Sequence, residues 1–285
     1  MLLVIKFVIF LLTAVAFYQL IKVKQTNTLG PWHKQGRLLV TGFVANVADT
    51  LGIGSFAVVI AFNKYWKLFD DKVLPGTLNA HSIVPAFLQA LFFLQVVEID
   101  VTTLLTMVVG ASIGGYLGGR IVAGLNKQAI RLAICIGYLG MAVLILGHQF
   151  SLLPIGGELY SLSNQKLFIG FIAMCCVGIL PSVGVGLYAP TQIVLFLLGM
   201  HPLAAFPIMT TAGAIQQPIT SLAFTIEGQV AKKQALILAG AGLLGVLISV
   251  PFVTSVEPRL LRWLLLAIVL YNTYVMAKSF RENKS

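Results

Sequence analysis

The chain has 285 residues, of which 58% are hydrophobic and only 10% are charged, whereas a soluble domain carries about 25% charged residues. This composition excludes an ordinary soluble enzyme or binding domain and predicts an all-α polytopic membrane protein. The formal net charge of +10 comes from Lys and Arg residues scattered through short loops. It therefore indicates basic loops on one membrane face rather than a nucleic-acid surface.

Nine hydrophobic segments follow one another along the chain, each long enough to cross a hydrocarbon core about 30 Å thick. They cover residues 2–21, 37–63, 75–97, 101–124, 128–148, 166–199, 203–226, 234–254 and 260–279. The first is followed by Lys22 and Lys24, which favours a signal-anchor helix; cleavage after the "AVA" at 14–16 is the minor alternative. We expect an anchor helix and basic loop over residues 1–35.

The sequence contains an internal repeat about 130 residues long. Segments two and six both contain Gly-Phe, at Gly42 and Gly170, and both contain a Gly-x-Gly further on. Pro85 in segment three corresponds to Pro218 in segment seven, and an acidic residue follows each of these segments. The expected organisation is transporter repeat 1 over 36–150, a linker over 151–164 and transporter repeat 2 over 165–285.

The distribution of Lys and Arg tests whether all nine segments cross, because cytoplasmic loops carry excess positive charge. If all cross, the two faces share these residues almost equally. If segments two and six are re-entrant hairpins, 15 of the 19 Lys and Arg residues gather on one face and Lys166, Arg259 and Arg262 lie on the other, with Lys6 set aside as intramembrane. This favours seven spanning helices, with the N-terminus outside and the C-terminus cytoplasmic. Each repeat then has a broken-helix hairpin and three spanning helices, so the repeats are inverted, a common transporter plan.

The two Gly-x-Gly stretches predict the hairpin tips, where glycine permits a sharp reversal of the chain. Beyond each tip we expect a half-helix, starting at about Ser55 and about Leu187. Their unpaired N–H groups and positive dipole ends would lie near the membrane centre and bind a small oxyanion. Close helix packing is the expected role of five other glycines, Gly110, Gly114, Gly115, Gly118 and Gly119.

Asp49 is the acidic residue deepest in a hydrophobic segment. A carboxylate at the bilayer centre costs about 2.5–3.5 kcal/mol on insertion scales, so it needs a proton, a partner or a wet cavity. One hypothesis is that Asp49 couples transport to protons. The other is that it caps the half-helix or hydrogen-bonds the backbone at the break. The second repeat has no carboxylate there, so a proton role would belong to one hairpin only.

Neutral polar residues near two prolines complete the expected site. Pro85 and Pro218 each remove a backbone hydrogen bond and should kink or open segments three and seven. Amide and hydroxyl donors suit sulfite or sulfonate oxygens, and His81 would add charge at lower pH, although a lone His more often serves packing. The candidate substrate-binding residues are Thr50, Gly52, Gly54, Ser55, Asn79, His81, Gly184, Gly186, Thr210, Thr211, Gln216 and Gln217, with Asp49 as the candidate proton-coupling residue.

Three stretches resemble the sulfite exporter TauE/SafE family, also called the toluene-sulfonate uptake permease family. They are "TGFVANVADTLGIGSFA", "LPGTLNAH" and "GVGLYAPTQIVLFLLGMHPLAAFPIM", and the resemblance extends over about residues 36–280. It implies a bacterial inner-membrane secondary carrier, here expected to be an exporter, of small sulfur-containing anions such as sulfite or organosulfonates, with proton coupling often proposed. The four tip glycines match the family's glycine-rich motif and Pro190 matches the proline after it. Gly-Ile-Gly-Ser stands here where many members have three glycines.

Other functions stay open at this point. An anion channel or a carrier of a non-sulfur organic anion would use a similar site. An intramembrane hydrolase is disfavoured because the sequence has no Gly-x-Ser-x-Gly stretch. Cys175 and Cys176 could form a thiol relay, but a packing role is favoured for both. We expect no enzyme activity, cofactor, metal site or nucleic acid. The expected partners are the anion, the lipid bilayer and protons as coupling ion, with a homodimer left open.

Overall fold

The computed structural model describes residues 2–22, 32–154, 156–252 and 258–282, and these ranges are helical with no β-strand. Short connections join the helices in chain order. The elements are α1 (Leu2–Lys22), α2 (Trp32–Thr50), α3 (Ser55–Trp66), η1 (Asp71–Val73), α4 (Leu74–Val96), α5 (Val101–Ala123), α6 (Lys127–Gln149), α7 (Asn164–Ile179), η2 (Leu180–Val183), α8 (Tyr188–Leu197), α9 (Pro202–Ile226), α10 (Lys232–Ser249), η3 (Val250–Phe252) and α11 (Pro258–Glu282).

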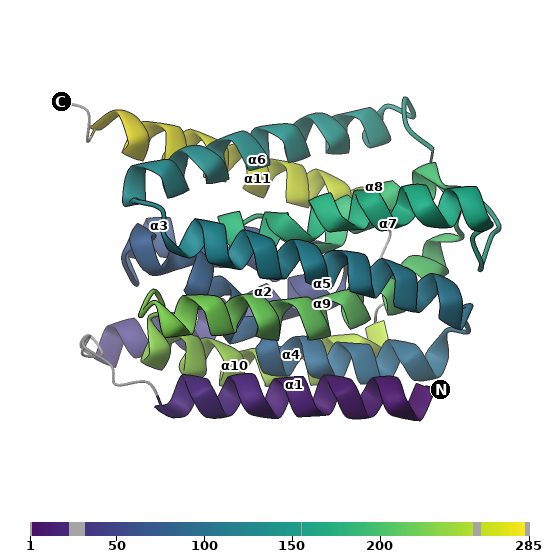
Figure 1. The fold of residues 1–285 in the computed structure, drawn as a ribbon. Coiled ribbons are helices and arrows are strands. Elements are labelled where there is room, and N and C mark those ends of the chain that lie inside the picture. Colours follow the sequence, from purple (N-terminus) through teal and green to yellow (C-terminus); the bar gives the residue numbers. More distant parts are fainter. Residues whose placement is uncertain (1, 23–31, 155, 253–257, 283–285) are drawn as a thin grey trace.

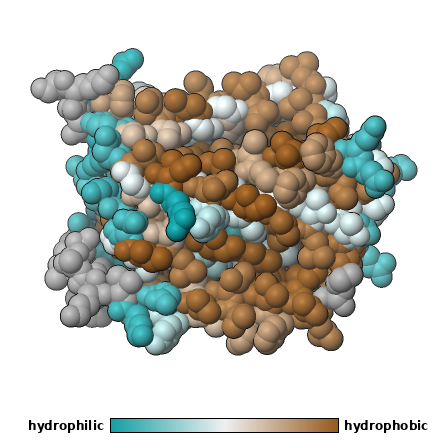
Figure 2. Space-filling model, viewed as in Figure 1, coloured by the Kyte–Doolittle hydropathy of each residue, from teal (hydrophilic) through white to brown (hydrophobic). Residues whose placement is uncertain are grey.

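The long helices lie side by side along one direction (Figure 1). Helices α6 and α11 pack together at one edge, and α1 packs against α4 and α9 at the opposite edge. Apolar side chains cover the middle of the visible face and polar ones gather at its two ends (Figure 2). This is the surface expected of a protein whose helices cross a bilayer. The chain is a multi-pass membrane protein.

Seven described helices are long and apolar enough to span, the number that the sequence predicts, but the set differs by one. The sequence predicts that residues 203–226 cross, whereas Asn164–Val183 meets the criterion and α9 does not. Helix α9 lies against α1, α4 and α5 inside the bundle. Because neighbouring helices shield it from lipid, α9 can carry polar residues such as Gln216 and Gln217, and these lower its hydropathy.

Both predicted helix breaks are confirmed. Helix α2 ends at Thr50 and α3 begins at Ser55, while α7 ends at Ile179 and α8 begins at Tyr188, one residue after the predicted start. Gly52 and Gly184 have φ angles of +89° and +86°, in the left-handed region that residues with a Cβ atom rarely adopt. In Figure 1, α3 lies in the left half of the molecule and α8 in the right half.

In each predicted repeat, the first helix of the broken pair packs against a helix of the other repeat. Helix α2 packs along α10, and its counterpart α7 packs along α5. Glycine permits both close approaches, since a Cβ atom on Gly245 would lie 2.6 Å from the Phe43 oxygen and one on Gly110 would lie 2.7 Å from the Phe171 oxygen. A Cβ atom added to any of the other four packing glycines would also meet neighbouring atoms, so the predicted packing role is confirmed. The inverted relation of the repeats stays a prediction.

Candidate substrate site between the two helix breaks

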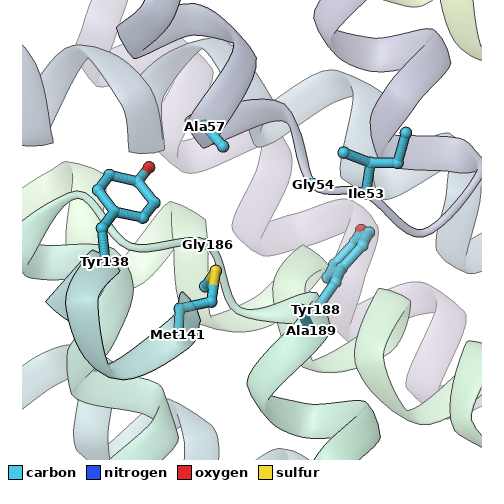
Figure 3. A pocket seen from close by; sticks show the side chains of 8 residues that line it. All are labelled: Ile53, Gly54, Ala57, Tyr138, Met141, Gly186, Tyr188 and Ala189. Atoms are coloured by element: carbon cyan, nitrogen blue, oxygen red, sulfur yellow. The ribbon is translucent and has the colours of Figure 1, made fainter. Parts of the chain in front are cut away.

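The two helix breaks meet at a small cavity. Residues from α6 and from both breaks line it (Figure 3): Ile53, Gly54, Ala57, Tyr138, Met141, Gly186, Tyr188 and Ala189. The cavity has about 10 Å³ of free space, which is room for about one water molecule. The two segments that the sequence predicts as hairpin tips are therefore brought together.

All four predicted tip glycines lie at this junction. Gly54 and Gly186 line the cavity. A Cβ atom on Gly52 would lie 3.3 Å from the Gln192 side-chain nitrogen of α8, so the first break touches the second half-helix. The Gly184 carbonyl accepts a hydrogen bond from the Tyr138 hydroxyl at 3.1 Å. The backbone thus approaches side chains closely on both sides of the junction.

Asp49 lies at the first break and is 4% exposed. Its Oδ1 atom accepts a hydrogen bond at 2.6 Å from the backbone N–H of Ser55, the first residue of α3. The carboxylate therefore occupies one of the unpaired N–H groups at the start of this half-helix. The contact is the one that the capping hypothesis expects, and it brings the negative charge to the position expected for a bound anion.

The two half-helices present different ends to the cavity, although the sequence predicts a similar role for both. The first turn of α3 contains Ser55, Phe56 and Ala57, all of which have N–H groups. The first turn of α8 includes Pro190, which has no N–H group. The start of α3 consequently offers more backbone N–H groups than the start of α8.

A buried hydrogen-bond chain connects the two breaks. The Tyr188 hydroxyl donates to Gln89 Oε1 at 2.6 Å, and Gln89 Nε2 donates to Thr50 Oγ1 at 3.0 Å. Thr50 is a predicted site residue, whereas sequence reasoning missed Tyr188, Gln89 and Tyr138. Gln89 carried a signal, since it is an amide four residues after Pro85 in an apolar run; the tyrosines carried little, because aromatic residues are common in such runs.

The predicted residues of α4 contact protein groups rather than the cavity. Asn79 Nδ2 donates to the Pro75 oxygen at 2.9 Å and to the Pro181 oxygen at 2.8 Å, so it holds the second break. His81 is fully buried, and its ring centroid lies 6.1 Å from that of Phe56. Neither Asn79 nor His81 is among the residues that line the cavity.

The predicted residues of α9 also lie outside the cavity lining. Thr210 donates to the Phe206 oxygen at 2.7 Å, within its own helix. Gln216 Nε2 donates to Thr220 at 2.6 Å, beside α5. Within the described ranges, Thr211 Oγ1 and Gln217 Oε1 have no hydrogen-bond partner. Gln217 lies close to the second half-helix, because its amide nitrogen and the Tyr188 ring both lie against Gly213.

Cys175 and Cys176 lie on α7, away from the cavity lining. Cys175 is half-buried and Cys176 is exposed, and both are free thiols. A thiol relay through the site would need two thiols that face the cavity, and neither cysteine is in such a position.

Comparison with known proteins agrees with this architecture. The family model described as "Sulfite exporter TauE/SafE" matches residues 2–145. This is half of the chain and covers helices α1 to α5, the first break and most of α6. A comparison with curated proteins finds no match. The family match extends to α1, which lies before the stretches that carry the resemblance in the sequence. The chain belongs to the sulfite exporter TauE/SafE family.

Proposed function

We propose that the protein is a secondary transporter that exports small sulfur-containing anions such as sulfite or organosulfonates. The observation that carries the proposal is the meeting of two helix breaks at one buried cavity. Broken helices at a repeat interface are the usual substrate site of secondary transporters. Family membership supports a sulfite- or sulfonate-type membrane transporter.

The proposed topology has two inverted repeats in the bacterial inner membrane, with the N-terminus outside and the C-terminus cytoplasmic. In this topology α2 with α3, and α7 with α8, are re-entrant hairpins that enter from opposite faces. The packing of α2 against α10 and of α7 against α5 supports this topology, because inverted repeats make equivalent contacts in pairs.

Cysteine labelling tests this topology in a background without the native cysteines. Gly36→Cys and Lys72→Cys, at exposed positions near the start of α2 and in η1 after α3, should react with a membrane-impermeant maleimide from the same face. Glu158→Cys, which precedes α7, should react from the opposite face. Reaction of the first two positions from opposite faces would refute the re-entrant first hairpin.

The cavity corresponds to a closed state of the transport cycle. Its volume of about 10 Å³ accommodates about one water molecule, whereas sulfite has a sulfur atom and three oxygens. Binding the anion therefore requires the two breaks to move apart. Alternating access would then expose the cavity to one membrane face at a time, by movement of one repeat against the other.

Proton coupling through Asp49 is part of the proposal. In the closed state the Asp49 carboxylate holds the Ser55 N–H at 2.6 Å, so an ionised Asp49 and an incoming anion compete for the same end of α3. Protonation removes the charge of Asp49 and with it the repulsion between the two anions. A proton and an anion are then carried in the same direction, so export on this route is driven by the outward gradient of the anion.

The decisive experiment measures charge movement by proteoliposomes on a solid support after addition of sulfite, sulfoacetate, taurine, acetate or chloride, with and without a pH step. We expect a saturable, pH-dependent current with a sulfur oxyanion. Asp49→Asn keeps an oxygen that can accept from Ser55 but cannot carry the proton, so it should abolish pH-driven transport and spare anion exchange. Electroneutral exchange moves no net charge and gives no current, so uptake of the radiolabelled anion is measured in parallel. If neither assay responds to any sulfur anion, the sulfur assignment is wrong.

A further inference from the structure

Two buried tyrosines bring hydroxyl groups to the cavity between the helix breaks. Tyr138 comes from α6 and Tyr188 is the first residue of α8, and their exposed fractions are 0% and 2%. In Figure 3 both rings extend toward the side of the cavity that Gly54 and Ala57 form. Among the described lining residues, these two are the ones whose side chains carry an O–H or N–H donor.

The hydrogen bonds around Gln89 fix the direction in which Tyr188 donates. The Thr50 hydroxyl donates to the Asn46 oxygen at 2.8 Å, which leaves its own oxygen as an acceptor. Gln89 Nε2 donates to that oxygen at 3.0 Å, so the Gln89 carbonyl faces Tyr188 and accepts from its hydroxyl at 2.6 Å. The network therefore holds Tyr188 as a donor.

The start of α3 supplies further donors to the same space. The first N–H groups of a helix have no partner within the helix, and the N-cap residue of α3, Gly54, makes no side-chain capping hydrogen bond. Asp49 accepts from the N–H of Ser55, and Ala57 in the same turn lines the cavity. No described lining residue is charged. The donors that line the cavity are thus neutral, and the Asp49 carboxylate lies beside them on the Ser55 N–H.

We propose that the hydroxyl groups of Tyr138 and Tyr188 bind the oxygen atoms of the substrate, and that Gln89 is a positioning residue for Tyr188. The inference rests on the proposed transport of a small oxyanion. When the anion enters, Tyr188 donates to it in place of Gln89, and Tyr138 donates to it in place of the Gly184 carbonyl. Two separated donors select an oxyanion with at least two acceptor oxygens over a halide, which has one acceptor atom.

The test is equilibrium binding of radiolabelled sulfite to the purified full chain in nanodiscs, with sulfoacetate and chloride as competitors. Tyr188→Phe and Tyr138→Phe each remove one hydroxyl and keep the ring. Each should weaken sulfite binding about 10- to 100-fold, the loss expected for one hydrogen bond to a charged ligand. Chloride competition should change little. The matched control is Tyr274→Phe, since Tyr274 is 66% exposed on α11 and should bind sulfite as the wild type does.

A double-mutant cycle separates positioning by Gln89 from a structural role. Gln89→Met removes both polar atoms at similar length and should weaken sulfite binding about three- to tenfold, because Gln89 no longer holds the Tyr188 hydroxyl beside the cavity before the anion enters. Stronger binding would show that Gln89 only competes with the anion for this hydroxyl and would contradict the positioning role. In the Tyr188→Phe background the same substitution should have no further effect. An additional loss in that background would contradict the positioning role. Size-exclusion profiles identify variants that do not fold, and the remaining variants still carry the test.

The outcomes distinguish this inference from the proposed function. Weaker binding in both Phe variants, with an unchanged control, supports the inference. If the wild type binds sulfite and both Phe variants bind it equally well, the inference is overturned while sulfur-anion transport stands. If the wild type binds neither sulfite nor sulfoacetate, the proposed function and the inference both fail.

Discussion

Replacement of Asp71 by Asn should destabilise the protein strongly. Asp71 lies just after α3, where its carboxylate forms ion pairs with Lys64 Nζ at 2.6 Å and Arg131 Nε at 2.7 Å. The side chains of all three residues are less than 10% exposed. Arg131 also donates to the Ser279 oxygen of α11 at 2.9 Å. One carboxylate therefore joins α3, α6 and α11, and Asp71→Asn leaves two buried cations without a counter-charge.

The expected size of the effect follows from burial. Loss of one partner from a buried ion pair costs about 3–5 kcal/mol, because the remaining charge stays buried without compensation. The adjacent residue supplies a matched control, since Asp70 pairs with Lys127 and their side chains are 55% and 39% exposed. Such an exposed pair contributes about 1 kcal/mol or less. The same Asp→Asn change at neighbouring positions should thus give very different results.

The assay is thermal unfolding in detergent micelles followed by tryptophan fluorescence. Trp66 stacks on Phe62 with a centroid distance of 4.8 Å at the end of α3, so it reports on the region of the cluster. About 1 kcal/mol corresponds to about 2–4 °C for a chain of this size class. We expect Asp71→Asn to lower the midpoint by about 6 °C or more, and Asp70→Asn by less than about 4 °C.

A second substitution sharpens the interpretation. Lys64→Met in the Asp71→Asn background removes one of the two unpaired cations and should restore part of the lost stability. Equal, small shifts for Asp70→Asn and Asp71→Asn would refute the assignment of a buried ion cluster. So would a further loss of stability on adding Lys64→Met, because the cation would then have another favourable environment.

Three other predictions test separate parts of the structure. Gly114→Ala should reduce the yield of folded protein in fluorescence-detected size-exclusion chromatography, since its Cβ atom would meet the Cys175 carbonyl, whereas a Cβ atom at Gly240 meets nothing within 4 Å and Gly240→Ala should behave as the wild type. Combined Cys175→Ala and Cys176→Ala should leave sulfite uptake unchanged, and its loss would favour the thiol relay. Partial burial alone would raise the pKa of Asp70, but the hydrogen bonds from Lys127 and the Lys72 N–H outweigh this and lower it. The Asp70 contribution is thus present above the unfolded pKa of about 3.9 and lost as the pH falls through the folded pKa. The difference in melting midpoint between wild type and Asp70→Asn should shrink below about pH 4, and a growing difference would contradict the pairing.

The helix breaks could be predicted from the sequence because their causes are local. Pairs of glycines interrupt otherwise apolar segments at Gly52 and Gly184, and these residues adopt positive φ angles that require little tertiary information to anticipate. Asp49 could be identified for the same reason, as an acid beside a break. Which helices span could be predicted less well, because α9 is polar inside the bundle and only its neighbours explain why.

The partners of polar side chains could not be predicted in the same way. A buried amide must be satisfied, but the sequence does not distinguish a ligand from a protein carbonyl as its partner. The sequence predicts that Asn79 faces substrate, and it contacts the Pro181 oxygen instead. Tyr188 and Gln89, which are 99 residues apart, meet only through the fold. Residues close to a break are thus predictable, and residues brought to it from other helices are not.

Helix α4 supports both breaks, which constrains how they separate. Near its start, Asn79 holds the second break through the Pro181 oxygen at 2.8 Å. Further along, Gln89 bonds to Thr50 at the first break and to Tyr188 at the second. If α4 moves with the first break, the hydrogen bonds of Tyr188 and Asn79 must both be lost. If it moves with the second, the hydrogen bond from Gln89 to Thr50 and the ring contact of His81 with Phe56 are lost. Because fewer buried donors lose their acceptors on the second route, we expect opening to separate α2 and α3 from α4 and α8 together.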